Sequence, residues 1–255
     1  MTAHRTLADR EDVLGALMLA PALAYVILLV GVPFGFAILL SFSDATAGSL
    51  HFGWAGLRNY AAILGDPIFL RALKNSAIVT VGSQLLVVII ATAAAQVLRA
   101  TFRGKRLARF VLLLPWAVPV SLIVQAWRIF PFATVIVLAG LSSIPQEIVE
   151  AAIVDGAGFW RRLFQVELPL LLPVVAVAVL FGVVYTATDL GVVYILTGGG
   201  PANTTHVLPT LAFQRGILGA DLGQGAAIAV FLLPFLVVVA VAMLRLARHT
   251  EVGAR

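Results

Sequence analysis

Four uninterrupted apolar runs constrain this chain more than any other feature of its sequence. They occupy residues 14–40, 77–98, 168 to about 196, and 226–246. A helix needs about 20 apolar residues to cross the ~30 Å hydrocarbon layer of a membrane, and each run reaches that length. The runs lack strict apolar–polar alternation, and a backbone in lipid must satisfy its own hydrogen bonds. They therefore predict an all-α polytopic membrane protein.

The overall composition also favours a membrane protein over a soluble one. Hydrophobic residues make up 61% of the 255 residues and charged residues only 11%, with a mean hydropathy of +1.05. A soluble domain of this length has too little interior to hide that much apolar surface. The absence of cysteine excludes disulfides, thiolate catalysis and cysteine metal sites. The four histidines are scattered, so we expect neither a metal nor another cofactor.

The basic residues predict how the chain is oriented. If both termini and the polar segment 143–167 face the cytoplasm, 12 Lys and Arg residues lie on that side and four lie in outer loops, with Arg128 assigned to neither. This asymmetry follows the positive-inside rule. We therefore expect a multi-pass protein of the cell (inner or plasma) membrane with cytoplasmic termini, in which residues 1–12 form a cytoplasmic tail. The net charge of +5 sets this orientation, so membrane lipid is an expected partner and nucleic acid is not.

The polar segment 143–167 predicts two short helices joined by a turn. Ser143 and Gln146 fit a capping box, so a helix is expected to start there and to run to about Val154. Gly156 and Gly158 then turn the chain, because glycine enters left-handed backbone space at little cost. A second helix is expected to follow the turn.

The second helix of this segment places aromatic side chains on one face. Phe159 and Trp160 precede Leu163 and Phe164 by four residues, which leaves residues 161–162, both arginine, in solvent. Small side chains before this helix would let another surface approach the backbone, and the aromatic ones would fill a pocket. The pattern favours a docking element, although a plain loop between two spans fits the same residues.

The same segment resembles the cytoplasmic signature loop, or EAA loop, of permease subunits of ATP-binding-cassette importers. The match rests on residues 150–152 (Glu-Ala-Ala), 155–157 (Asp-Gly-Ala), Phe164 and 168–169 (Leu-Pro). In that family the loop is a coupling helix that docks in a groove of a separate ATPase subunit. The resemblance implies an ATPase-coupling site made of seven residues: Glu150, Ala151, Ala152, Asp155, Gly156, Phe159 and Phe164.

Other stretches resemble the carbohydrate-type branch of this family, which includes maltose and glycerol-3-phosphate importers. They are residues 56–60, 115–119 and 196–201. The resemblance implies a type I importer fold of about six spans in a single transmembrane permease domain, residues 1–255. It also implies three kinds of partner: a second permease subunit in a pseudo-symmetric heterodimer, two cytoplasmic ATPase subunits and an extracytoplasmic solute-binding protein.

The middle of the chain is shorter than this family pattern. Residues 110–141 number 32, whereas two full crossings need about 40 residues and family members carry roughly forty more here. We therefore expect spans 3 and 4 to be shortened around residues 118–128. Because the basic stretch 99–109 and the segment 143–167 should share one side, we predict a bent hairpin that turns between Pro119 and Pro131. An internally truncated, inactive permease is the alternative.

Asp189 is an acidic residue inside an apolar run. A carboxylate there is costly and by default faces a cavity or a partner, so it marks a transport path. Tyr185 and Thr188 offer an aromatic face and a hydroxyl group, which suit the C–H patches and hydroxyls of a sugar. These three residues are our candidates for the translocation path. The alternative is a carboxylate near the outer surface that only caps a helix.

Together these features predict the membrane-spanning permease subunit of an ATP-driven importer for sugars or related polyols. Solute would pass from a binding protein to the cytoplasm by alternating access. The chain contains no nucleotide-binding motif, so we expect no catalytic site here and ATP hydrolysis by a separate subunit. An ion-coupled secondary transporter is the alternative, although that class usually requires ionisable residues at the midplane of two related halves.

Overall fold

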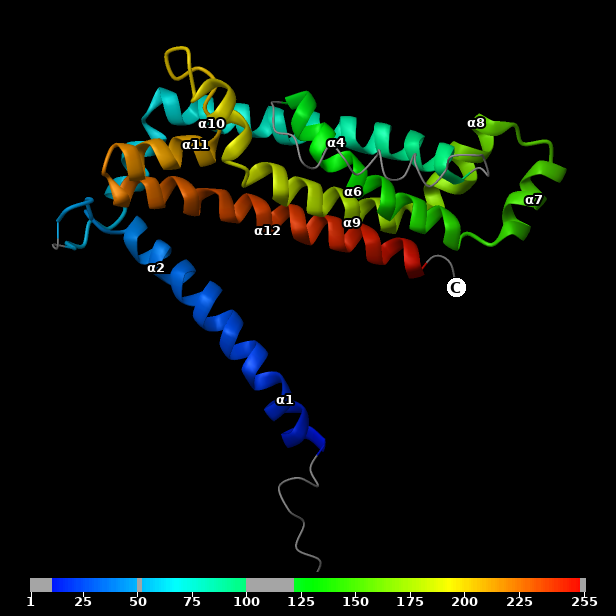
Figure 1. Ribbon diagram of the computed structural model, residues 1–255, viewed down its shortest axis with the longest axis horizontal. Helices are drawn as coiled ribbons and strands as arrows, with labels where there is room; N and C mark the ends of the chain where they lie inside the picture. The colour runs from blue at the N-terminus through cyan, green and yellow to red at the C-terminus, as the bar shows by residue number, and fades with distance from the viewer. Residues whose placement is uncertain (1–10, 50–51, 100–121, 253–255) are drawn as a thin grey trace, which may run out of the picture.

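The computed structural model describes residues 11–49, 52–99 and 122–252, and this part of the chain is helical, with two isolated β-bridges and no strand. Four long helices lie side by side in an elongated bundle (Figure 1): α4 (Pro67–Arg99), α6 (Leu122–Ser143), α9 (Leu168–Ala187) and α12 (Leu222–Val252). α4 packs against α6 and α9, and α9 packs against α12. The prediction of an all-α polytopic protein is confirmed.

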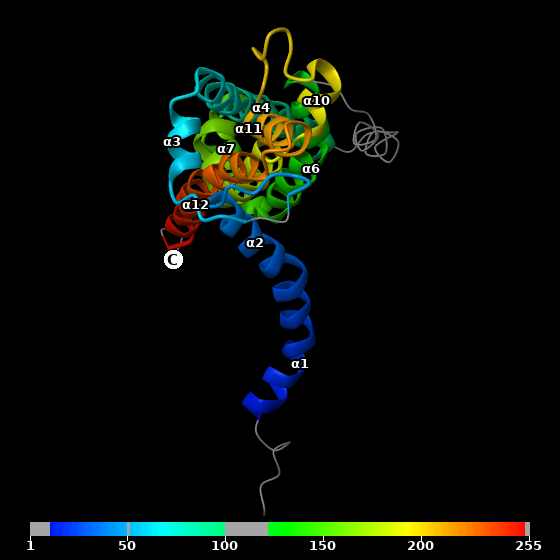
Figure 2. The same cartoon turned by 90° about the vertical axis from the view of Figure 1, so that its left-hand side faces the viewer.

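The N-terminal helical stretch leaves this bundle. α1 (Glu11–Val26) continues through a π-helical turn (Ile27–Gly31) into α2 (Val32–Ser41), and Figures 1 and 2 both show the stretch projecting away from the other helices. Residues 17–34 are all exposed. A helix that is apolar on every side needs lipid or another chain around it. The end of the stretch joins the bundle where α2 packs on α12.

Five described helices are long and apolar enough to cross a membrane. They cover residues 17–41, 67–99, 125–143, 159–187 and 222–247. Four of them coincide with the four apolar runs, which confirms those predicted spans. The sequence predicts about six spans, and the remaining one would fall in residues 100–121, outside the described residues.

α9 ends earlier than the sequence predicts. The apolar run continues to about residue 196, but the helix stops at Ala187 and α10 (Gly191–Thr197) begins after a break. Asp189 stabilises the break, because its Oδ1 accepts a hydrogen bond from the Gly191 N–H at 2.9 Å. A short polar side chain that bonds nearby backbone groups competes with a helix, which apolarity alone does not reveal.

The structure of α6 contradicts part of the predicted hairpin. It is one continuous helix from Leu122 to Ser143 with Pro131 inside it, so the chain does not turn between residues 122 and 131. Proline is tolerated in a membrane helix where neighbouring helices support the freed backbone groups. A turn at residues 119–121 would lie outside the described residues. Arg99 at the end of α4 lies 2.7 Å from Glu167, so these two residues lie at the same end of the bundle, as the prediction requires. Residues 100–109 of the basic stretch lie outside the described residues, and the shared side stays a prediction.

Small residues let the bundle helices approach one another closely. Gly140 of α6 lies against α9, where an added Cβ atom would come within 2.8 Å of the Leu171 side chain. The core between α4, α6 and α9 consists of compact side chains: Val87, Ala91, Ala126, Ile129, Ala133 and Ala178. Such packing is typical of membrane helices, because close van der Waals contact replaces a hydrophobic driving force between them.

Short helices occupy both ends of the bundle (Figure 1). α7 (Gln146–Val154) and α8 (Phe159–Arg162) lie at one end, and α3 (Arg58–Leu64), α10 and α11 (Leu208–Phe213) lie at the other. At the α10–α11 end, Asn75 of α4 donates hydrogen bonds to the carbonyl oxygens of Thr204 and His206, both at 2.9 Å. Arg215 also pairs there with Asp66. These bonds fix the α10–α11 loop against α4.

His206 in this loop is buried, and we predict that it makes the stability of the loop depend on pH. Its Nδ1 lies 3.0 Å from Thr210 Oγ1 and its Nε2 lies 3.2 Å from Asn203 Oδ1. Burial lowers the pKa of His206 below its ordinary 6.5, a hydrogen bond to Gln214 opposes that shift, and the charge of Arg215 adds to it. The unfolded chain therefore binds the proton more readily than the folded one. The stability from the neutral ring is lost as the pH falls below about 6.5.

We expect the backbone amides of residues 199–211 to exchange hydrogen faster, relative to the intrinsic rate, as the pH is lowered from neutral through this range. The change in opening free energy should be at most about 1.4 kcal/mol per pH unit, the limit for one proton. In His206→Gln the same amides should lose this dependence, since glutamine does not titrate. An unchanged pH dependence in the variant would assign it to another group.

Candidate functional site at the α7–α8 turn

The chain between α6 and α9 folds into a tight turn at one end of the bundle (Figure 1). α7 ends at Val154, and Gly156 follows with φ of +73°, a left-handed conformation that glycine adopts at low cost. The Asp155 and Ala157 N–H groups donate to the carbonyl oxygens of Ala151 and Ala152, both at 2.9 Å. These bonds satisfy carbonyls that the helix end would otherwise leave free. The turn predicted at Gly156 is confirmed, whereas Gly158 has φ of −65° and is not left-handed.

The start of α7 differs from the predicted capping box. Ser143 belongs to the last turn of α6, and its Oγ donates to the Gly140 carbonyl oxygen at 2.8 Å. Pro145 precedes the first helical residue, Gln146, without a side-chain cap. The side chain of Gln146 instead donates to Glu150 Oε1 at 2.9 Å. The capping box is therefore wrong, because α6 extends far enough to use the Ser143 hydroxyl itself.

The surface of this turn is apolar and exposed. Val154, Trp160 and Phe164 are 86%, 68% and 60% exposed. The ring centroid of Trp160 lies 5.1 Å from that of Phe159 and 6.1 Å from that of Phe164, so the predicted four-residue aromatic pair is confirmed. Aromatic side chains gathered on an exposed segment are typical of an interaction surface.

The predicted coupling residues all lie on this turn. Six of them are exposed and Ala152 is half-buried; the exposed ones are Glu150, Ala151, Asp155, Gly156, Phe159 and Phe164. The expectation that both arginines face solvent is only half right. Arg161 is exposed and bonds Gln165, whereas Arg162 is half-buried with its Nε 3.4 Å from Glu167. The carboxylate of Glu167 draws Arg162 inward.

Glu167 ties the turn to the bundle, and the sequence analysis did not identify it. It is 1% exposed, and its Oε1 accepts a hydrogen bond from Arg99 Nη1 at 2.7 Å. Its other oxygen accepts a hydrogen bond from Gln96 of α4. One buried carboxylate thus connects α4 with the helical stretch that leads from α8 into α9. Glutamate is rarely buried unless paired, so an acidic residue just before an apolar run was the available signal.

A second polar cluster surrounds the break between α9 and α10. Arg128 of α6 donates to Asp189 Oδ2 at 2.9 Å and to the Tyr185 hydroxyl oxygen at 2.7 Å, and its guanidinium lies 5.4 Å from the Tyr185 ring centroid. Thr188 bonds the carbonyl oxygen of its own helix, at Val184. The three path candidates therefore lie together, and Arg128 is the partner that the sequence left unassigned. Asp189 also accepts a hydrogen bond from the Gly191 N–H, and its place on a transport path stays a prediction.

An open pocket of about 270 Å³ adjoins this cluster. Arg128, Tyr185 and Thr188 line it together with two aromatic rings, Phe132 and Phe181, whose centroids lie 6.0 Å apart in an edge-to-face arrangement. The pocket offers aromatic faces, one cation and hydroxyl groups. Such a combination can hold a molecule that carries both apolar patches and hydroxyls.

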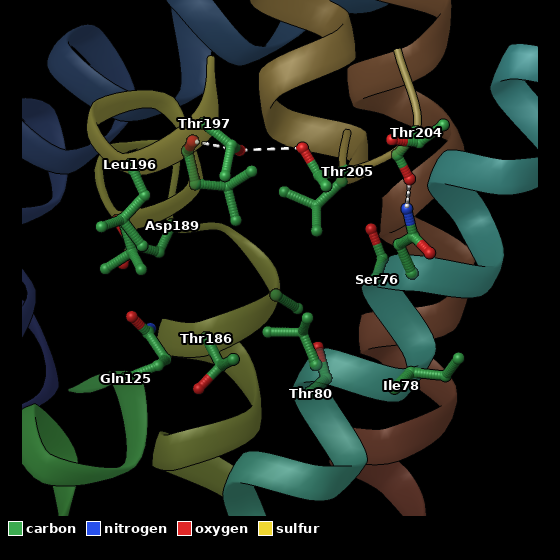
Figure 3. Close-up of a pocket in the computed structure, with 16 residues that line it drawn as sticks. Ser76, Ile78, Thr80, Gln125, Thr186, Asp189, Leu196, Thr197, Thr204 and Thr205 are labelled. Atoms are coloured by element: carbon green, nitrogen blue, oxygen red, sulfur yellow. Dashed lines mark hydrogen bonds between the residues drawn. The ribbon is translucent and has the colours of Figure 1, made fainter. Parts of the chain in front are cut away.

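A second open pocket, of about 280 Å³, lies among α4, α6, α9 and α10 (Figure 3). Its polar lining comes from these four helices, the break between α9 and α10, and the loop after α10: Asn75, Ser76, Thr80, Gln125, Thr186, Asp189, Thr197, Thr204 and Thr205. It shares no lining residue with the open pocket beside Arg128. Hydroxyl and amide groups therefore converge on this pocket, which no sequence motif indicates.

Comparison with known proteins connects this geometry to transport. The family model described as "Binding-protein-dependent transport system inner membrane component" matches residues 77–252. The sulfoquinovosyl glycerol transport system permease protein SmoG of Agrobacterium fabrum is 29% identical, over 96% of this chain and 93% of that protein. The trehalose/maltose transport system permease protein MalF of Thermococcus litoralis is 30% identical, over 87% of this chain and 89% of that protein.

Solved structures support the same fold. A chain of the bacterial ABC transporter involved in the import of the acidic polysaccharide alginate superposes with a TM-score of 0.73, over 93% of this chain and 96% of that chain. A chain of the MetNI methionine ABC transporter in an inward-facing conformation gives a TM-score of 0.57 over 71% of this chain. The identities are 18% and 17%, so these likenesses concern the fold.

The alignments also bear on the short middle region. The alignment with SmoG runs over 288 positions, whereas 96% of the 255 residues of this chain is about 245, so roughly 43 positions are gaps in this chain. The size agrees with the shortening expected from the family pattern. Its position at residues 118–128 stays a prediction.

Proposed function

This chain belongs to the family of binding-protein-dependent transport system inner membrane components and is a membrane-spanning permease, and we propose that it imports sugars or related polyols as one subunit of an ATP-driven transporter. The names of the relatives, which include sulfoquinovosyl glycerol and trehalose/maltose permeases, support this solute class. They favour the importer over an ion-coupled secondary transporter. The proposed partners are a second permease subunit, two ATPase subunits and a solute-binding protein.

The observation that carries this proposal is the exposed aromatic turn at one end of the bundle. Trp160 and Phe164 present large apolar surfaces that nothing within the described chain covers. We infer that this surface docks in the ATPase subunit, with Gly156 and the small alanines before it allowing close approach. The turn would then lie in the cytoplasm, as would both termini.

The connection between the turn and the rest of the bundle supports a coupling role. Helical structure runs without interruption from Phe159 through the π-helical turn (Leu163–Glu167) to Ala187. Glu167 fixes the first part of this stretch to α4. If the ATPase displaced the turn, α9 would therefore move together with it. The far end of α9 lies beside the Arg128–Asp189 pair, because Tyr185 of α9 accepts a hydrogen bond from Arg128, and solute passage would respond there by alternating access.

The path proposal concerns the open pocket beside this cluster. Tyr185, Phe132 and Phe181 would face the C–H patches of a sugar, and Thr188 would bond its hydroxyls. The pocket is open, and we infer that a second permease subunit completes it. The Arg128–Asp189 pair has no net charge, which suits a neutral solute.

Single-cysteine labelling tests the orientation and the docking surface together, since the chain has no cysteine of its own. We expect Val154→Cys to react with a membrane-impermeant maleimide in inside-out vesicles and not in right-side-out vesicles, and bound ATPase subunits should slow that reaction. Trp54→Cys, a 75% exposed position in the segment between α2 and α3, should show the opposite sidedness. Labelling of Val154→Cys from outside would refute the proposed function.

Asp189→Asn is expected to lower the rate of ATP-driven uptake by about tenfold, while the complex still assembles. The substitution leaves the Arg128 guanidinium without its carboxylate inside an apolar region, which is costly. Uptake should be measured in proteoliposomes with the binding protein and ATP, and with an ion gradient alone. The double variant Arg128→Gln, Asp189→Asn should recover part of the rate, because both charges are gone. Unchanged uptake in Asp189→Asn would remove this residue from the path.

A further inference from the structure

A third open pocket, of about 500 Å³, lies between the α7–α8 turn and the end of α4. Two arginines line it, Arg99 of α4 and Arg162 of α8. Both contact the same carboxylate oxygen, since Glu167 Oε1 lies 2.7 Å from Arg99 Nη1 and 3.4 Å from Arg162 Nε. Glu167 itself is 1% exposed and does not line the pocket. The two arginines therefore present positive charge to the pocket.

Arg162 retains hydrogen-bond donors for a molecule in this pocket. Its Nε is enclosed, but its two terminal NH2 groups keep accessible surface and donate no hydrogen bond to any described residue. Glu167 is shared with Arg99, so this carboxylate neutralises Arg162 only in part. The planar fork of an arginine matches two oxygens of one phosphate or carboxylate group. The pocket therefore favours an anion.

One carboxylate opposes this preference. Glu150 of α7 also lines the pocket, and it accepts a hydrogen bond from Gln146 at 2.9 Å. Glu150 is exposed, whereas Arg162 is half-buried, and salt and water screen an exposed charge more strongly than a half-buried one. The charge of Arg162 should therefore dominate, and removing the charge of Glu150 should strengthen the binding of an anion.

The level of the pocket in the membrane indicates where such an anion comes from. The apolar run 77–98 ends directly before Arg99, and the next long run begins at Leu168, directly after Glu167. The Arg99–Glu167 pair therefore lies where two membrane helices leave the hydrocarbon layer. Lipid headgroups occupy the next layer, which is about 5–8 Å thick on each side of a membrane. Basic pockets between helices at this level suit acidic lipid headgroups.

We propose that this pocket binds the headgroup of an anionic phospholipid, whose phosphate accepts hydrogen bonds from the terminal NH2 groups of Arg162. A zwitterionic headgroup has the same phosphate, but it also carries a cation that the two arginines repel. The apolar side chains of Val149 and Ile153, which line the same pocket, contact the carbon atoms that link the phosphate to the acyl chains. This site depends on the membrane spans and not on the docking of an ATPase.

The test measures lipid binding to the purified permease, with and without the ATPase subunits, by native mass spectrometry. Phosphatidylglycerol and phosphatidylcholine with identical acyl chains are titrated as the anionic and the zwitterionic probe. Arg162→Gln removes the proposed phosphate ligand, and Arg99 remains to neutralise Glu167, so we expect this variant to fold. Arg161→Gln is the matched control, because Arg161 is the preceding residue of α8 but is exposed and lies outside the pocket.

We expect the first phosphatidylglycerol to bind about tenfold more tightly than phosphatidylcholine, the effect of one hydrogen bond between charged groups. Arg162→Gln should remove this preference, and Arg162→Lys should keep part of it because lysine keeps the charge. Glu150→Gln should increase the preference, and Arg161→Gln should leave it unchanged. Equal binding of the two lipids to the unmodified chain overturns the proposal. An equal loss in Arg161→Gln and Arg162→Gln also overturns it, since that would mean diffuse attraction to a basic surface.

Two further measurements identify the occupant. Millimolar inorganic phosphate should not displace the lipid, because it makes no apolar contact, and displacement would reveal a site for soluble anions and overturn the proposal. Bound ATPase subunits should leave the first phosphatidylglycerol in place. If they expel it, an acidic group of the ATPase is the occupant and the lipid proposal fails. If the lipid preference is present while no ATPase binds, the lipid proposal stands and the coupling proposal fails.

Discussion

Gly156→Val is expected to abolish ATP-driven uptake and ATPase co-purification, while the permease still inserts into the membrane. Gly156 has φ of +73°, and a β-branched residue is strained in that region by roughly 1–2 kcal/mol. An added Cβ at Gly156 would meet no atom of this chain within 4 Å, so the subunit itself has room for it. The loss must then arise from the backbone of the turn or from the surface that docks there. The measurements are uptake in proteoliposomes and pull-down of the ATPase through a tagged permease.

Two control variants separate these causes. Gly158→Ala lies two residues away, has φ of −65° and also meets no atom, so we expect nearly normal uptake. Gly156→Asn adopts the left-handed conformation at lower cost than valine. If asparagine restores ATPase binding, the backbone conformation is what docking requires, and if it does not, close approach of the ATPase is the requirement. Normal uptake in Gly156→Val would contradict the coupling role.

The spans and the turn could be predicted from the sequence because both depend on local features. An apolar run longer than the bilayer thickness specifies a crossing helix, and the structure has helices at residues 67–99 and 222–247 where such runs occur. The break at Gly156 follows from the backbone freedom of one residue. Neither feature requires knowledge of what packs nearby.

The features that the sequence did not reveal depend on contacts between distant residues. The Arg99–Glu167 pair joins positions 68 residues apart, and Arg128 meets Asp189 from 61 residues away. A single sequence contains no signal for such pairs. The open pocket that Gln125 lines has the same origin, because it exists only where α4, α6, α9 and α10 converge. The coupling residues stay predictions until the ATPase is shown to touch them.

Glu167→Gln is expected to destabilise the permease and to uncouple ATP hydrolysis from uptake. The amide keeps the size of the side chain but removes the charge that compensates Arg99 and Arg162, which are only 29% and 24% exposed. Removing one partner of a fully buried pair costs 3–5 kcal/mol, so we expect about 2 kcal/mol for this partly exposed pair. For a chain of this size that is roughly 4–8 °C in the melting temperature. Thermal unfolding of the purified transporter measures it.

The uncoupling follows from the position of Glu167 between the turn and α4. Removing the charge of Glu167 leaves the exposed aromatic face unchanged, so the ATPase should still bind. The movement of the ATPase would reach α4 less directly, because the Arg99–Glu167 ion pair is lost. We therefore expect the ratio of ATP hydrolysed to solute imported to rise several-fold in Glu167→Gln. Glu147→Gln makes the same change on an exposed position of α7 and should alter neither the melting temperature nor that ratio. If Glu167→Gln lowers the melting temperature but leaves the ratio of ATP hydrolysed to solute imported unchanged, the carboxylate stabilises the bundle and takes no part in coupling.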